Sequence, residues 1–175
     1  MRDAMIAGLT LNIFNNHCDR VRMANLAQTV NVLQAVVLTD KEKMILTPTY
    51  HVMEMYNVHQ DATMLPVNVK SSDYVLGNRK LPAVSASASR DNQGLTHISL
   101  VNIDASKTQT IEINIQGGNY NTISGRILTA AKMQDHNTFE KPETIKPAVF
   151  KNFKKTDNLL SVTLPPFSVV VLEMK

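Results

Sequence analysis

The sequence has very few cysteine and aromatic residues. Its 175 residues include one cysteine, Cys18, no tryptophan and an aromatic fraction of only 5%. A single thiol excludes an internal disulfide and a thiolate metal cluster. The shortage of aromatic rings also counts against a carbohydrate-binding module, because such sandwich modules grip sugar rings by stacking aromatic faces on them.

The sequence also lacks a strong charge of one sign and a long hydrophobic run. The net charge is +3, and its basic pairs, Arg79-Lys80 and Lys154-Lys155, stand far apart. They resemble solvated loop charges more than a phosphate-binding stripe, so we expect no nucleic-acid partner. No run approaches the roughly 20 apolar residues of a membrane helix, and the first residues lack the layout of a signal peptide. We therefore expect no membrane partner.

The first 60 residues predict a helix, a strand and a second helix. Residues 3–17 carry apolar side chains at helical spacing, and Val21–Gln28 is the best candidate for the strand. The second helix is predicted over residues 46–59, with Thr47 as its N-cap and Pro48 at its first position. Its predicted apolar face consists of Val52, Met55, Tyr56 and His59.

From about residue 61 the pattern changes to short strands. Residues 84–90, 111–115 and 159–164 alternate with period two, which predicts half-buried strands. Residues 97–103 and 167–174 are apolar on both parities and predict central strands. About eight strands without intervening helices indicate an antiparallel β-sandwich. The predicted fold is therefore mainly β, a jelly-roll-like sandwich preceded by an N-terminal α/β piece.

Two stretches do not follow these patterns. Residues 131–147 are polar, contain Pro142 and Pro147, and predict a long surface loop. The apolar run between Arg20 and Asp40 instead contains regularly spaced amides. Burying an unpaired amide costs roughly 1–3 kcal/mol, so these side chains need protein partners or an uncharged polar ligand such as a sugar. They are Asn25, Gln28, Asn31 and Gln34.

Several long segments resemble one enzyme family. AGLTLNIFNNHCDRVRMANLAQTVNVLQAVVLTD and LTPTYHVMEMYNVHQDA resemble the end of the catalytic (β/α)8 barrel of the α-L-arabinofuranosidases of glycoside hydrolase family fifty-one. LVNIDASKTQTIEINI and LPPFSVVVLEMK are similar to that family's C-terminal sandwich. The resemblance implies that residues 1–60 are the last helix-strand-helix of the barrel and that residues 61–175 are the C-terminal β-sandwich domain.

The resemblance also implies an activity. Members of this family are exo-acting, retaining and cofactor-free enzymes that remove terminal α-L-arabinofuranosyl groups from arabinan and arabinoxylan. They use two glutamates, and retention requires the two carboxyl groups to stand about 5–5.5 Å apart. Both glutamates lie in family segments that precede the first residue here, so we expect a C-terminal fragment that has no catalytic residue and does not hydrolyse substrate alone. The implied partners are an arabinose-containing oligosaccharide or polysaccharide and further copies in a homo-oligomer.

One residue of the sugar site is implied within the chain. Barrel active sites lie at the carboxyl ends of the strands, where the family's AQ-x-VNV segment places Gln28. A carboxamide can donate to one sugar oxygen and accept from another hydroxyl. The alternative is that Gln28 only holds loop backbone. Asn25 and Asn31 are weaker candidates that would support the loop, and backbone hydrogen bonding is the simpler interpretation for both.

Other polar groups favour structural roles. The adjacent residues His17, Cys18 and Asp19 point in different directions, and His17 suits the end of a helix dipole. His51 and Glu54 share a helix face but lack a third ligand, so no metal is expected. Residues 135–138 predict a loop-ordering network.

Three functional interpretations remain open. The chain is the tail of an arabinofuranosidase, a sugar-binding module, or an interaction domain. Because residues 1–60 cannot bury their apolar faces alone, we expect them to fold back on the sandwich, to pair with another copy, or to be poorly ordered.

Overall fold

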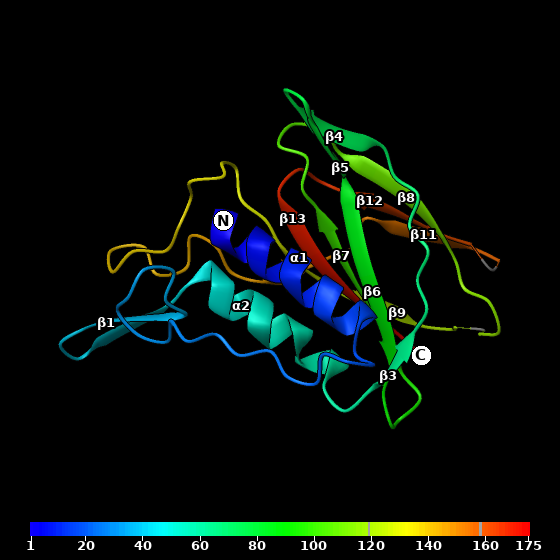
Figure 1. The fold of residues 1–175 in the computed structure, drawn as a ribbon, viewed down its shortest axis with the longest axis horizontal. Coiled ribbons are helices and arrows are strands. Elements are labelled where there is room, and N and C mark those ends of the chain that lie inside the picture. Colours follow the sequence, from blue (N-terminus) through cyan, green and yellow to red (C-terminus); the bar gives the residue numbers. More distant parts are fainter. Residues whose placement is uncertain (119, 158) are drawn as a thin grey trace.

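The computed structural model describes residues 1–118, 120–157 and 159–175. Figure 1 shows two helices lying across a sheet, with further strands behind it. The helical segments are α1 (Arg2–Asn16), α2 (Pro48–Met55) and the 3-10 turn η1 (Tyr56–His59). The strands are β1 (Val37–Asp40), β2 (Lys43–Leu46), β3 (Thr63–Leu65), β4 (Asp73–Leu76), β5 (Arg79–Pro82), β6 (Val84–Arg90), β7 (Thr96–Asn102), β8 (Gln109–Asn114), β9 (Ile123–Leu128), β10 (Ala148–Val149), β11 (Phe153–Thr156), β12 (Leu159–Leu164) and β13 (Ser168–Met174).

Most of the strands form an antiparallel sandwich, which confirms the predicted fold class. One sheet has the order β10-β9-β13-β7-β6-β3, and the other has the order β11-β12-β8. Strands β7 and β13 are central and are buried on both faces, apart from Glu173. Strands β8 and β12 alternate, with one face toward the shared core. The main core side chains are Ala86, Leu100, Leu160, Val162, Leu164, Val170 and Leu172.

A helical layer covers the outer face of the six-stranded sheet. Met5 of α1 and Val52 and Met55 of α2 pack in one cluster with Val101 of β7 and with other side chains of that face. Helix α1 approaches the sheet closely at Gly8, where an added Cβ would lie 3.0 Å from Cγ2 of Val101. Of the three outcomes expected for residues 1–60, the structure therefore has the one in which the helices fold onto the sandwich.

The strand predicted over Val21–Gln28 is wrong. These residues run from α1 toward β1 without regular structure, and no strand among the described residues pairs with them. A strand needs a neighbouring strand whose backbone pairs with its own N–H and C=O groups. Local sequence alone does not show whether such a strand is present.

The serine face of β6 also differs from the expectation of a half-buried strand. Ser87 and Ser89 are as buried as the alanines on the opposite face. The Ser87 hydroxyl donates to Oδ1 of Asn12 at 2.8 Å, and Oγ of Ser89 lies 2.7 Å from Nδ1 of His59. The small polar face is therefore covered by the polar side chains of the helical layer.

In the chain, the hairpin β1–β2 lies between α1 and α2, and the sequence analysis does not predict it. Its strands pair from Val37↔Leu46 to Asp40↔Lys43, and it projects from the body of the molecule (Figure 1). Helix α2 begins as predicted, because Oγ1 of Thr47 accepts from the backbone N–H of Tyr50 at 3.5 Å. Residues 131–147 form the predicted long loop.

Candidate functional site

The segment that contains Gln28 is joined by backbone hydrogen bonds to the start of the β1–β2 hairpin. The Gln28 carbonyl accepts from the N–H of Val36 at 3.2 Å, and the Thr29 carbonyl accepts from the N–H of Val37 at 3.0 Å. The N–H of Asn31 donates to the Val37 carbonyl at 3.2 Å. The Gln28 side chain itself is exposed. Gln28 thus stands on a fixed backbone with its side chain directed to solvent.

This backbone is tied in turn to the first turn of α2. The Val36 carbonyl accepts from the N–H of Thr47 at 3.0 Å and from its hydroxyl at 3.1 Å. The loop of the sandwich reaches the same place, since Nδ2 of Asn137 donates to the Leu46 carbonyl at 2.8 Å. Asn137 is buried and also exchanges hydrogen bonds with the Ile145 backbone at 2.9 and 2.7 Å. Residues 135–138 therefore contain the loop-ordering contact that the sequence predicts.

The other amides of the segment have different surroundings. Asn31 makes two side-chain hydrogen bonds to Thr39 on β1. Asn25 and Gln34 lie on the rim of one hollow of about 160 Å³ between the segment, α1 and α2. The structure thus brings Asn25 and Gln34 to a common hollow, while Asn31 lies against the hairpin. The hollow is largely apolar, with Ile6, Ala7, Leu11, Phe14, Leu26 and Met53 on its walls.

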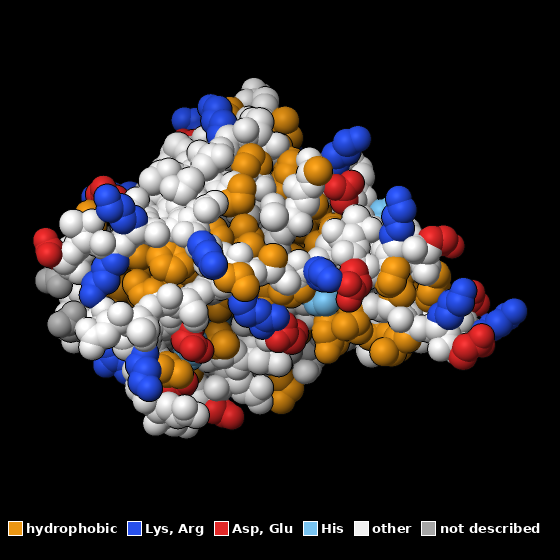
Figure 2. Space-filling model, turned by 180° about the vertical axis from the view of Figure 1, so that it is seen from behind, with side chains coloured by type: hydrophobic (Ala, Val, Ile, Leu, Met, Phe, Trp, Pro, Cys, Tyr) orange, Lys and Arg blue, Asp and Glu red, His pale blue; other side chains and the backbone are white. Residues whose placement is uncertain are grey.

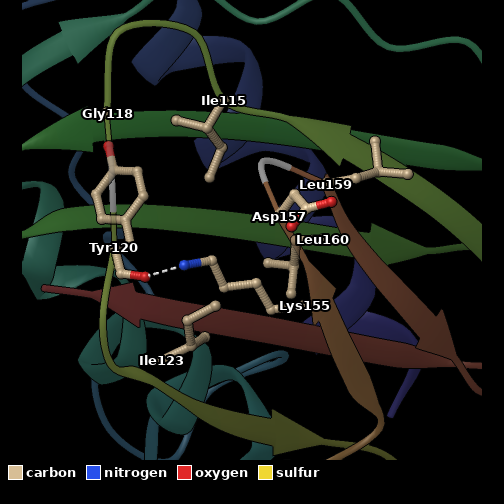
Figure 3. A pocket seen from close by; sticks show the side chains of 8 residues that line it. All are labelled: Ile115, Gly118, Tyr120, Ile123, Lys155, Asp157, Leu159 and Leu160. Carbon is tan, nitrogen blue, oxygen red and sulfur yellow. Dashed lines mark hydrogen bonds between the residues drawn. The ribbon is translucent and has the colours of Figure 1, made fainter.

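A second, smaller hollow lies at the end of the sandwich. Figure 3 shows Lys155 reaching across it so that its ammonium group donates to the Tyr120 carbonyl. Its space of about 20 Å³ holds roughly one water molecule. Most of its other lining side chains are aliphatic, among them Ile115, Ile123 and Leu160. A hollow of this size and composition cannot receive a sugar ring.

His59 and Tyr56, whose pKa values are the most strongly shifted, lie at the contact between the helical layer and the sheet. Burial and the nearby His97 lower the pKa of His59 to about 4. Burial raises the pKa of Tyr56, whose hydroxyl donates toward Oδ1 of Asn12 at 3.0 Å. Nε2 of His97 lies 3.2 Å from a carboxylate oxygen of Asp91. None of these groups lines either hollow, so they serve the packing of the two layers.

The remaining sequence candidates are also placed in structural roles. His17 is the C-cap of α1, and its ring lies 3.4 Å from the Arg20 guanidinium. Glu54 accepts two hydrogen bonds from Arg126, at 2.9 and 2.8 Å, which joins α2 to β9. In the part of the chain that the structure describes, no three His, Cys, Asp or Glu side chains gather as a set for a metal ion. Likewise, no described helix is long and apolar enough to cross a membrane.

Sequence reasoning missed the hairpin and therefore missed Thr39 and Thr47 as parts of this site. The signal was present in VLTDKEKMIL, where two short apolar runs flank a charged turn.

Comparison with known proteins identifies the family. Residues 1–168 match the family model described as the α-L-arabinofuranosidase C-terminal domain. The chain belongs to this family. The match covers the whole helical layer and the sandwich as far as the start of β13, which confirms the resemblance seen in the sequence.

Comparison with individual relatives supports the same family assignment. The chain is 48% identical over 176 residues to an intracellular exo-α-L-arabinofuranosidase of Bacteroides ovatus, a match that covers 100% of this chain and 34% of that protein. It is 25% identical over 180 residues to an intracellular exo-α-(1→5)-L-arabinofuranosidase of Bifidobacterium longum, covering 98% and 32%. The GH51 arabinofuranosidase structure from Xanthomonas axonopodis pv. citri superposes with a TM-score of 0.95 at 42% identity, covering 98% and 35%. The chain thus spans about a third of the length of these relatives.

Proposed function

We propose that this chain is the C-terminal part of an exo-acting, retaining α-L-arabinofuranosidase that removes terminal α-L-arabinofuranosyl groups from arabinan or arabinoxylan. The observation that carries the proposal is the 48% identity to the Bacteroides ovatus enzyme along the whole chain. The match covers 100% of this chain, so it includes the helical layer and the segment around Gln28 as well as the sandwich.

We further propose that the two catalytic glutamates belong to the part of the enzyme that this chain does not span. A retaining glycosidase needs a free pair of carboxyl groups about 5–5.5 Å apart. Here Glu54 is held by Arg126, and Glu143 accepts from Lys146 at 2.6 Å. Glu42, Glu112, Glu140 and Glu173 are exposed, on the hairpin, on β8, in the long loop and on β13. These positions favour structural and surface roles for the glutamates of this chain.

The proposed division places residues 1–60 in a (β/α)8 barrel and residues 61–175 in an accessory sandwich. The distribution of exposed apolar side chains supports it, because eight of the fourteen large hydrophobic side chains exposed on the described chain lie within residues 1–60. Leu33, for example, is 86% exposed. Seen from behind the view of Figure 1, the surface shows hydrophobic areas with charges of both signs among them (Figure 2). A barrel wall would cover the apolar surface of the first 60 residues.

Within the complete enzyme, we propose that the Gln28 side chain hydrogen-bonds to the substrate. Its exposed carboxamide and its hydrogen-bonded backbone suit a side chain that must meet a sugar at a fixed position. The complete enzyme is also proposed to be a homo-oligomer. The hairpin β4–β5 offers exposed Val75, Leu76 and Leu81 for such a contact.

Two measurements test this function. Replacing Gln28 by Ala in the complete enzyme should lower kcat/KM roughly 10–1000-fold, as expected when a positioned hydrogen bond to substrate is lost. An unchanged kcat/KM would remove Gln28 from the site. Titration of the chain alone with arabino-oligosaccharides should show no binding at millimolar concentration, whereas binding at that level would favour a sugar-binding module.

A further inference from the structure

We propose that Asn31 is a positioning residue that fixes Gln28 by clamping its loop to the β1–β2 hairpin. The inference rests on the proposed contact between Gln28 and substrate. It adds the hairpin to the sugar site, as the support that sets the position of the glutamine.

The clamp is a reciprocal pair of short hydrogen bonds. Nδ2 of Asn31 donates to Oγ1 of Thr39 at 2.8 Å, and Oδ1 of Asn31 accepts from the backbone N–H of Thr39 at 2.7 Å. One carboxamide therefore engages both the side chain and the main chain of the same residue. This fixes the carboxamide in both distance and orientation relative to β1.

The backbone of Asn31 is adapted to this arrangement. Its φ of 53° lies in the left-handed region, which Asn tolerates better than most other residues. The turn directs the side chain to Thr39 while the Asn31 N–H donates to the Val37 carbonyl. Glycine would keep this backbone without strain and would remove only the clamp.

The clamp and the Gln28 carbonyl hold the two ends of one four-residue segment. At one end, the Gln28 carbonyl accepts from the N–H of Val36. At the other end, the Asn31 side chain forms hydrogen bonds with Thr39, which follows Val36 by three residues in the chain. With both ends attached, the backbone of the segment is held against the start of the hairpin, and this sets the position from which the exposed Gln28 side chain extends.

The energetic consequence should appear in catalysis more than in stability. Both bonds lie at the surface, where a hydrogen bond contributes little net stability to folding because water competes for the same groups. A displacement of about 1 Å in a substrate-positioning group can nevertheless cost up to about 100-fold in rate. Loss of the clamp should therefore lower kcat/KM and leave the unfolding midpoint almost unchanged.

The test uses a complete enzyme made by joining this chain to the upstream two-thirds of the Bacteroides ovatus relative. Asn31→Gly keeps the left-handed backbone and removes the carboxamide, and Thr39→Val removes the hydroxyl and keeps the backbone N–H. Each should lower kcat/KM on a chromogenic α-L-arabinofuranoside by about 3–30-fold. Thr39→Ser should restore most of the activity, and Glu42→Ala, at the tip of the same hairpin, is the matched control.

A double-mutant cycle separates positioning from a merely structural role. If Asn31 acts through Gln28, the double variant Gln28→Ala/Asn31→Gly should be no slower than Gln28→Ala alone. Additive losses would overturn the inference, as would an unchanged rate in both Asn31→Gly and Thr39→Val while Gln28→Ala is impaired. An unimpaired Gln28→Ala enzyme would instead refute the proposed function of Gln28, and that result is distinct from failure of the clamp alone.

Discussion

Nε2 of His59 lies 2.6 Å from Oγ of Ser99, at the centre of the six-stranded sheet. The other ring nitrogen lies 2.7 Å from Oγ of Ser89 on the neighbouring strand. One imidazole at the end of the helical layer thus bridges β6 and β7. Together with Asn12 of α1, it satisfies the buried hydroxyl groups that line this face.

This bridge should make the domain sensitive to acid. The pKa of His59 is lowered to about 4 by burial and by His97, whereas the unfolded chain has the ordinary value of 6.5. Between these values the unfolded state binds more protons, so stability is complete above about pH 6.5 and falls as the pH drops toward 4. The difference corresponds to about 3 kcal/mol.

Urea unfolding of the wild type and of His59→Gln between pH 4 and pH 7 measures this contribution. The neutral amide removes the histidine's titration, so the variant should lose less stability over that range, while the carboxylates titrate alike in both proteins. Equal losses in the two proteins would show that His59 is not the acid-sensitive group. NMR titration of the His59 ring would provide its pKa directly.

Asn12 should contribute more to stability than its partner Tyr56. Oδ1 of Asn12 accepts from the hydroxyl groups of Ser87 and Tyr56, and its Nδ2 donates to Ser85. Asn12→Ala removes all three of these hydrogen bonds, although the Tyr56 hydroxyl can still donate to the Gly8 carbonyl and Ser87 still accepts from Asn15. This loss should cost about 2–3 kcal/mol, whereas Tyr56→Phe removes one hydroxyl and should cost about 1 kcal/mol. Tyr50→Phe on α2 is the control, with almost no change expected. Urea midpoints test the order, and a larger loss in Tyr56→Phe would contradict it.

The long loop should depend on Asn137. Its side chain makes three hydrogen bonds, to the Leu46 carbonyl and to the backbone of the buried Ile145. Asn137→Ala should destabilise the chain by about 2–3 kcal/mol, because buried backbone groups lose their partners. Nδ1 of the exposed neighbour His136 lies 2.9 Å from the Gln134 carbonyl, two residues away, so His136→Ala should change stability by less than about 0.5 kcal/mol. Similar losses in the two variants, measured by thermal unfolding, would contradict this role.

The sandwich could be predicted from sequence because its strands have strong local patterns. The alternation in 159–164 and the apolar residues on both parities of 167–174 depend only on which faces are buried, and the structure confirms both, apart from the exposed Glu173. The N-cap at Thr47 could also be predicted, because it depends only on residues next to it in the sequence. These signals need no knowledge of distant parts of the chain.

The errors arose where a partner decides the structure. A strand is predicted over Val21–Gln28, but a strand forms only beside another strand, and no described strand lies beside these residues. The serines of β6 indicated an exposed face, and their burial depends on Asn12 and His59, which lie far away in sequence. The Asn31–Thr39 clamp depends on the β1–β2 hairpin, which the sequence analysis does not predict.

The kcat/KM of the hybrid enzyme, in which this chain replaces the matching third of the Bacteroides ovatus relative, tests the central claim most directly. The claim predicts that the hybrid releases arabinose from a chromogenic α-L-arabinofuranoside within about tenfold of the parent rate, because the chain supplies the missing wall and its glutamine. The isolated chain should release none. A folded hybrid without activity, or an isolated chain that cleaves the substrate, would contradict the account.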